Sequence, residues 1–355
     1  MEMTISELKP VLKTYIVKKK PLYIHGAPGI GKSDSAKSVS AEVAKEKGKD
    51  LFEGIKEGTF GFVDIRVSQL DPSDLRGIPF PNKELGTTEW LRPSWLPDDP
   101  ESEGVLFLDE MNLAPPSIQA AAYQLILDRR LGDYILPDGW SIVAAGNRAI
   151  DKANVFPMSI PLKDRFSHAH LLPPSDDEWV KWGTEVGNIR SDILAFIKFK
   201  PSLLHKIDKD AKSDAFPTHR SWATASFMTE GVKNMDEEVR LVATCVGEGA
   251  ANVYSGFIRL KNKVKIDEIL KDPTKAKNID EVGLKYTLIS GLAEKYRHDR
   301  KLCDPIIQVV DNIDAEFGVF LMRMMKGYQK KHFSDDLAKS PTWKKIFQKY
   351  NKYVL

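Results

Sequence analysis

The sequence contains one segment whose residue types and spacing match a phosphate-binding loop: Gly26-Ala27-Pro28-Gly29-Ile30-Gly31-Lys32-Ser33. Its glycines let the backbone N–H groups and the positive end of the next helix surround phosphate oxygens closely. Lys32 offers a point charge to the β and γ phosphates, and Ser33 offers a hydroxyl to magnesium. A chance glycine-rich turn is the alternative. The apolar run before the loop and the helical pattern after it favour the phosphate site.

A second segment ends in two acids. The apolar run 104–108 is followed by Asp109 and Glu110, an arrangement in which the first carboxylate holds magnesium and the second activates water. Such a pair can also end a strand merely to cap the next helix. Gly146-Asn147-Arg148 closes a later apolar run, which we expect to lie beside the strand of Asp109. Asn147 would then orient the attacking water next to the γ-phosphate.

Short apolar runs that alternate with helical patterns predict a parallel sheet covered by helices. We expect strands at 22–25, 61–67, 105–108 and 141–145, helices at 32–47 and 116–130, and a hairpin arm formed by residues 134–136, the turn Pro137-Asp138-Gly139 and Trp140. From about residue 175 apolar residues recur at helical spacing. The predicted domains are therefore an α/β nucleotide-binding core at 1–173 and a helical lid with a C-terminal helical region at 174–355.

The composition is that of a folded globular protein, with 42% hydrophobic and 29% charged residues among 355. A formal charge of +2 gives no global reason to bind nucleic acid. Cys245 and Cys303 stand alone, so neither a disulfide framework nor a zinc site is indicated. Without an apolar leader or a long apolar stretch, we expect a cytoplasmic protein that does not enter a membrane.

These residues together resemble the MoxR family of AAA+ ATPases, and the resemblance extends over nearly the whole chain. It is carried by residues 64–77, Leu108-Asp109-Glu110-Met111-Asn112, residues 120–125, Ala144-Ala145-Gly146-Asn147-Arg148, Pro161-Leu162-Lys163-Asp164-Arg165-Phe166 and Phe216-Pro217-Thr218-His219-Arg220-Ser221-Trp222. The family implies a P-loop NTPase (AAA+) core with hairpin inserts near a pore, a helical lid, and a hexameric or similar ring with ATP and Mg²⁺ at subunit interfaces.

By the same resemblance, Arg165 looks like an arginine finger that reaches the neighbouring subunit's site, and Arg220 looks like a sensor that couples the γ-phosphate to lid closure. A planar guanidinium suits both parts, because it neutralises charge on the phosphoryl oxygens in the transition state. Taken alone, Arg165 could be a surface residue and Arg220 could pair with Asp214 or Glu230. Arg148 and Arg190 are the next finger candidates.

Three segments depart from the family pattern or leave alternatives open. His219 stands where the family has proline, which affects the geometry expected of Arg220. The segment 68–103, which corresponds to an insert near the pore, could equally be a surface loop packing its own aromatics. The stretch 326–352 alternates lysines with aromatics, which is typical of a helical core with a solvated outer face and less so of a nucleic-acid surface.

The leading hypothesis is an ATP-driven, chaperone-like remodeller that assembles or activates a partner protein. The chain has no von Willebrand factor A domain, so a partner of that kind would be a separate protein. The alternatives are a nucleic-acid-associated AAA+ motor or regulator, and a scaffold whose slow hydrolysis times assembly. The near-zero charge favours the first over the second, and Glu110 counts against the third.

Overall fold

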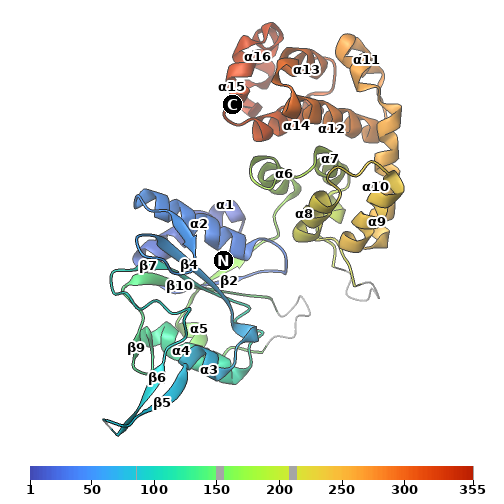
Figure 1. Cartoon of the computed structure of the whole chain (residues 1–355). Helices are drawn as coiled ribbons and strands as arrows, with labels where there is room; N and C mark the ends of the chain where they lie inside the picture. The colour runs from blue at the N-terminus through green and yellow to red at the C-terminus, as the bar shows by residue number, and fades with distance from the viewer. Residues whose placement is uncertain (85, 149–155, 208–213, 355) are drawn as a thin grey trace. The chain divides into compact units, whose positions relative to one another are not determined.

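The computed structural model describes residues 1–84, 86–148, 156–207 and 214–354, with side chains up to residue 350. The chain divides into two compact units, Met1–Pro173 and Pro174–Leu355 (Figure 1). The first unit combines strands with helices, and the second is built from helices alone in its described part. The predicted fold class, an α/β core with a parallel sheet followed by an all-helical region, is confirmed.

The sheet of the first unit has the strand order β1-β11-β2-β10-β7-β4-β3 within the described residues, and every neighbouring pair is parallel. All four predicted strands are present, and the strand that ends before Asn147 does lie beside the strand of Asp109. The strands are β1 (Glu2–Met3), β2 (Leu22–His25), β3 (Leu51–Glu53), β4 (Phe60–Arg66), β7 (Glu103–Asp109), β10 (Gly139–Gly146) and β11 (Ser167–Leu171).

The sheet is apolar on both faces because alternate residues of each central strand enter different cores. On β7, Val105 and Phe107 join one core with α1 and α2, whereas Leu106 and Leu108 join another with α3, α4 and α5. This double burial explains the continuous apolar runs in the sequence. The covering helices are α1 (Ile5–Lys18), α2 (Lys32–Glu46), α3 (Pro72–Arg76), α4 (Pro116–Asp128) and α5 (Ile160–Asp164).

Two hairpins leave the sheet. Within residues 68–103, β5 (Ile78–Asn82) pairs with β6 (Thr87–Leu91), and its Phe80 and Trp90 side chains are exposed. The second pairs β8 (Arg130–Leu131) with β9 (Tyr134–Ile135). The hairpin reverses at Gly132, whose φ is 59°. The predicted turn at Pro137-Asp138-Gly139 does form, with the Trp140 N–H donating to the Pro137 carbonyl oxygen at 3.0 Å, but it does not close the hairpin. Gly139 instead begins β10, where an added Cβ would lie 2.0 Å from the Ser102 carbonyl oxygen.

The helical unit has a single apolar core. Its C-terminal aromatics Tyr328, Phe333, Trp343 and Tyr350 belong to that core or pack against it, which favours the structural interpretation of the 326–352 stretch. No helix in the described part of the chain is long and apolar enough to cross a bilayer. The helices are α6 (Asp176–Glu185), α7 (Ser191–Phe199), α8 (His219–Met228), α9 (Met235–Val246), α10 (Glu248–Ile258), α11 (Ile266–Lys271), α12 (Val282–His298), α13 (Cys303–Val310), α14 (Ala315–Tyr328), α15 (Phe333–Lys339) and α16 (Pro341–Val354).

Candidate nucleotide-binding and catalytic site

The glycine-rich loop joins the end of β2 to the start of α2, as a phosphate loop requires. Gly29 and Gly31 have φ values of 73° and 89°, in the left-handed region that favours glycine. Gly26 has a different constraint, since an added Cβ would lie 2.7 Å from the Ile30 side chain. The loop therefore needs its glycines both for backbone conformation and for close packing.

Lys32 is buried, with 8% of its surface exposed, and its ammonium lies inside the loop. Its Nζ donates hydrogen bonds to the carbonyl oxygens of Gly26 at 2.9 Å and Ala27 at 3.0 Å, and to Oδ1 of Asn147 at 3.1 Å. These three acceptors are neutral. The charged oxygens of a phosphate would bind the ammonium more strongly than they do.

Ser33 and Asp109, the two predicted magnesium ligands, contact each other. The Ser33 hydroxyl donates to Oδ2 of Asp109 at 3.0 Å, and the backbone N–H of Glu110 donates to Oδ1 of Asp109 at 2.8 Å. One hydroxyl and one carboxylate fit Mg²⁺, which takes few protein ligands and completes its shell with water and substrate phosphates. The described residues contain no cluster of three or more His, Cys, Asp or Glu that could hold a metal without such help.

Glu110 has an unusual backbone for a residue with a side chain, with φ at 56°. A left-handed conformation outside glycine stores local strain, which the surroundings must hold. The Glu110 carboxylate also accepts a hydrogen bond from the Ser68 hydroxyl. Sequence reasoning did not select Ser68 as a site residue. The signal was its position two residues beyond β4, which lies next to β7 with Arg66 opposite Asp109.

Asn147 is held by a second residue that sequence reasoning also missed, Asn112. The Asn147 N–H donates to Oδ1 of Asn112 at 3.1 Å, and Nδ2 of Asn112 donates to the Asn147 carbonyl oxygen at 2.6 Å. Gly146 allows this approach, because an added Cβ would lie 1.9 Å from the Tyr23 hydroxyl oxygen and 2.3 Å from Oδ1 of Asn112. These two hydrogen bonds with Asn112 hold the backbone of Asn147 in place, and the Asn147 side chain contacts Lys32.

The two predicted arginines, Arg165 and Arg220, are both exposed. Arg165 follows α5, is 41% exposed, and pairs with the neighbouring Asp164 at 3.2 Å, with no hydrogen bond to Lys32 or Glu110. Arg220 is the second residue of α8 in the helical unit, is exposed, and forms no ion pair with any acid in the described ranges. Its pairing with Asp214 or Glu230 is therefore not seen.

Arg190 is not available as a finger, which corrects its place among the next candidates. Its guanidinium lies in a buried network, with ion pairs to Asp192 at 2.6 Å and Glu238 at 2.7 Å and a hydrogen bond to the Thr229 carbonyl oxygen. Burial opposes the charge of the buried Asp192, but Lys261 and Arg190 hold the pKa of that carboxyl at about 2. Arg190 thus stabilises the helical unit.

His219, the departure from the family pattern, is buried, and its Nε2 lies 2.9 Å from the Pro174 carbonyl oxygen. Since a carbonyl only accepts, Nε2 carries the proton in this contact. Burial lowers the pKa of His219 to about 4, so the ring is neutral near pH 7. The histidine therefore anchors the start of α8, one residue before Arg220, to the first residue of the helical unit.

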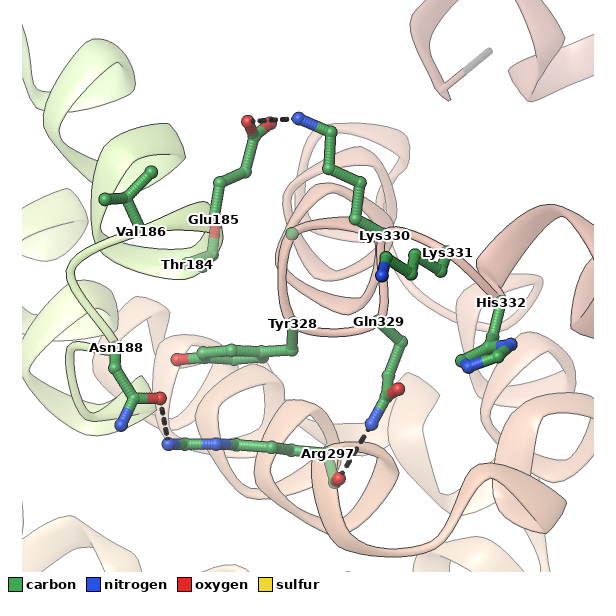
Figure 2. A pocket seen from close by; sticks show the side chains of 11 residues that line it. Thr184, Glu185, Val186, Asn188, Arg297, Tyr328, Gln329, Lys330, Lys331 and His332 are labelled. Atoms are coloured by element: carbon green, nitrogen blue, oxygen red, sulfur yellow. Dashed lines mark hydrogen bonds and ion pairs between the residues drawn. The ribbon is translucent and has the colours of Figure 1, made fainter. Parts of the chain in front are cut away.

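A surface pocket of about 450 Å³ in the helical unit lies beside the end of α14 (Figure 2). The Arg297 guanidinium lies 4.9 Å from the Tyr328 ring centre and donates to Asn188, and Lys330 pairs with Glu185 at 3.0 Å. Its basic groups surround the carbonyl end of a helix, where cations are stabilising without any ligand. The pocket's carboxylate, Glu185, is already paired with Lys330, and the candidate site remains the phosphate loop of the α/β unit.

No protein-family model and no curated protein matches the sequence. Among solved structures, the chain is 14% identical to a candidate ATPase from Cytophaga hutchinsonii, covering 99% of this chain and 89% of that one, with a TM-score of 0.34. It is 12% identical to NtrX from Brucella abortus in complex with ATP, covering 99% and 69%, with a TM-score of 0.33. It is 13% identical to the Thermotoga maritima RuvB branch migration motor, covering 98% and 85%, with a TM-score of 0.31.

Such low identities and TM-scores assign neither a family nor an activity to this chain. What the chain's own residues define is a phosphate loop whose lysine, hydroxyl, two carboxylates and amide meet at the carboxyl ends of β2, β7 and β10. In open parallel sheets, ligands bind at the carboxyl ends of the strands.

Proposed function

We propose that this chain is a magnesium-dependent ATPase of the AAA+ class, similar to the MoxR family, that works in a ring and remodels a partner protein. Two hydrogen bonds carry the proposal. Lys32 donates to Asn147, and Ser33 donates to Asp109. Positive charge, a hydroxyl and carboxylate pair, a second carboxylate and an amide are the groups that phosphoryl transfer to water requires.

Each residue has one task in this reaction. The loop N–H groups and Lys32 bind the β and γ phosphates, and Lys32 exchanges its carbonyl partners for phosphate oxygens. Ser33 and Asp109 would hold Mg²⁺, which neutralises charge that develops on the phosphates. Glu110 accepts the proton of the attacking water once its carboxylate turns from Ser68. Asn147 orients that water and the γ-phosphate.

The transition state also needs a cation at the γ-phosphoryl oxygens. Arg165, which is exposed and forms no hydrogen bond to the chain's own loop, fits a finger presented to a neighbouring subunit. A ring, most simply a hexamer, supplies that neighbour at every interface. Arg220 would couple binding of the γ-phosphate to closure of the helical lid. The client is a separate protein, with a von Willebrand factor A domain protein as the first candidate.

Lys32→Ala tests the phosphate site, and Lys37→Ala is its matched control on the same helix, because Lys37 pairs with Glu53 at 2.6 Å. Calorimetry in magnesium buffer should show that Lys32→Ala loses tight ATP binding, since it removes the only side-chain cation of the loop. Lys37→Ala should bind as the parent protein does. Equal ATP affinity in both variants would refute the placement of the site.

Mixing two inactive variants tests the ring. Arg165→Ala retains a complete phosphate loop and Lys32→Ala retains a finger, so mixed rings contain some interfaces with both parts intact. Hydrolysis should rise above that of either variant alone. A mixture that stays inactive, although native mass spectrometry detects mixed rings, would contradict the action of Arg165 across the interface.

A pull-down with Glu110→Gln tests the client. This variant should bind ATP and hydrolyse it slowly, which prolongs the loaded state. A client protein should be retained with ATP and released with ADP. Retention of nucleic acid in place of a protein would overturn the assignment as a protein remodeller.

A further inference from the structure

Three histidines gather where β2 meets β11, and none of the roles above uses them. The parallel register places Tyr23 opposite His168 and His25 opposite His170. The rings of His25 and His170 stack with centroids 4.5 Å apart and planes 8° apart. The described part of the chain contains no group of three or more His, Cys, Asp or Glu residues that could hold a metal ion.

A donor and an acceptor can be assigned in each hydrogen bond of this cluster. Nε2 of His168 lies 2.9 Å from the Lys163 carbonyl oxygen, which can only accept, so Nε2 carries the proton. In the tautomer with its proton on Nε2, Nδ1 of His168 is an acceptor, and it lies 2.9 Å from Nε2 of His25. His25 therefore donates to His168, which donates to Lys163. Burial and the neighbouring histidines lower the pKa of His25 to about 4, which keeps that ring neutral near pH 7.

Both ends of this chain of contacts adjoin the candidate catalytic machinery. His25 directly precedes Gly26, whose carbonyl oxygen accepts from Lys32. At the other end, Lys163 lies in the last turn of α5, whose carbonyls lack partners within the helix. The Lys163 carbonyl oxygen accepts only from His168 and, at 3.2 Å, from the Phe166 N–H among the described residues. Asp164 and Arg165 lie between Lys163 and Phe166.

We propose that His168, held by His25, is a positioning residue for Arg165. Its hydrogen bond to Lys163 fixes the end of α5 to β11, and its contact with His25 links it to β2, the strand before the phosphate loop. Together these contacts set the direction in which the Arg165 side chain points from the end of α5. The inference rests on the proposed function, because a positioned finger matters only if a neighbouring subunit uses it. It assigns His168 no contact with nucleotide.

Two amide substitutions at His168 separate the two hydrogen bonds. The side-chain amide of Asn reaches about as far as Nδ1 of histidine, and that of Gln about as far as Nε2. His168→Asn keeps an acceptor for His25 and loses the donor to Lys163, whereas His168→Gln keeps that donor. We expect His168→Asn to lower the hydrolysis rate about 10-fold or more with unchanged ATP affinity, and His168→Gln to stay within about twofold of the parent.

The pattern of complementation distinguishes positioning from general damage. His168→Asn should be rescued by Lys32→Ala subunits, which bring an intact finger, and not by Arg165→Ala subunits, which do not. In an Arg165→Ala background, His168→Asn should cause no further loss, because the two residues act through one group. Native mass spectrometry and melting temperature check that rings form and that the fold is retained.

Several results would overturn the inference: a normal rate in His168→Asn, an equal loss in His168→Gln, or a further loss in the Arg165→Ala background. Should His168→Asn fail to fold, His25→Phe keeps the ring on His170, loses the donor to His168, and should show the same complementation. If Arg165→Ala itself hydrolyses normally, the trans finger of the proposed function fails. If Arg165→Ala is inactive and rescued while His168→Asn is not rescued, only the positioning role fails.

Discussion

Lowering the pH should destabilise the α/β unit through His25. The ring is surrounded by potential cations, with His168 and His170 on β11, Lys163 on α5 and Lys32 on α2. Burial is the largest cause and these neighbours add to it, so the pKa of His25 falls from 6.5 to about 4. His25→Gln is the matched perturbation, because Gln does not titrate and keeps an N–H that reaches His168.

The sign and size follow from linkage. The folded-state pKa is depressed, so between pH 6.5 and about 4 the unfolded chain takes up a proton that the native chain does not. The contribution is fully present above pH 6.5 and is lost as the pH falls through the folded-state pKa. A difference of about 2.5 pH units at about 1.4 kcal/mol each sets an upper limit of about 3 kcal/mol in the free energy of unfolding, and solvent screening at the partly exposed ring reduces it to about 1–2 kcal/mol.

Urea denaturation between pH 7 and pH 4, followed for the parent protein and His25→Gln, measures this contribution. As the pH falls, the parent should lose about 1–2 kcal/mol more of its free energy of unfolding than His25→Gln does. His298→Gln, at an exposed histidine on α12, serves as the control and should leave the parent profile unchanged. Parallel profiles for the parent and His25→Gln, or an NMR titration of the His25 ring near pH 6.5, would refute the reasoning.

Three further substitutions follow from the same contacts. Glu110→Gln should retain ATP affinity and lose at least about 100-fold in turnover, measured by phosphate release, because the amide cannot accept the proton; normal turnover would remove Glu110 from the mechanism. Gly146→Ala should lower the free energy of unfolding by about 1–3 kcal/mol and slow hydrolysis, because its Cβ would displace the Asn112 side chain that holds Asn147. An unchanged denaturation midpoint would contradict this close packing. Arg190→Ala should cost about 3–5 kcal/mol by leaving Asp192 and Glu238 less well paired, yet Lys32→Ala subunits, which bring an intact Arg190, should not complement any loss of activity in it.

The strands and the phosphate loop were predictable because their signals are local. A run such as 104–108 is apolar throughout only when both faces of the strand are covered, and a glycine-rich loop between such a run and a helix has few other uses. The position of Asn147 beside Asp109 needed one further step, the expectation that β10 and β7 are neighbours. The roles of the site residues stay predictions until hydrolysis is measured.

Ser68, Asn112 and the histidine pair were not predictable, because their partners are fixed by strand register and not by sequence spacing. Ser68 contacts Glu110 across 42 positions, and His25 contacts His168 across 143. A serine after a strand has no distinguishing mark in a single sequence. The hairpin was misplaced for a different reason: the Pro-Asp-Gly turn forms as its sequence predicts, but it leads into β10, and the hairpin reverses earlier at Gly132.

The difference between the loop residues and the arginines has a physical origin. Residues that bind phosphates and magnesium must be in place before the nucleotide binds. The carboxyl ends of neighbouring strands bring them together within a single chain. A cation raises the rate of the chemical step only if it stabilises the transition state more than the ground state. Such a cation therefore does not need to contact the phosphates when the nucleotide first binds. In the proposed function, an exposed Arg165 that pairs with Asp164 would suit this part, because its helix end is linked through His168 and His25 to β2. Hydrolysis would then depend on a neighbour being in place, which links turnover to assembly.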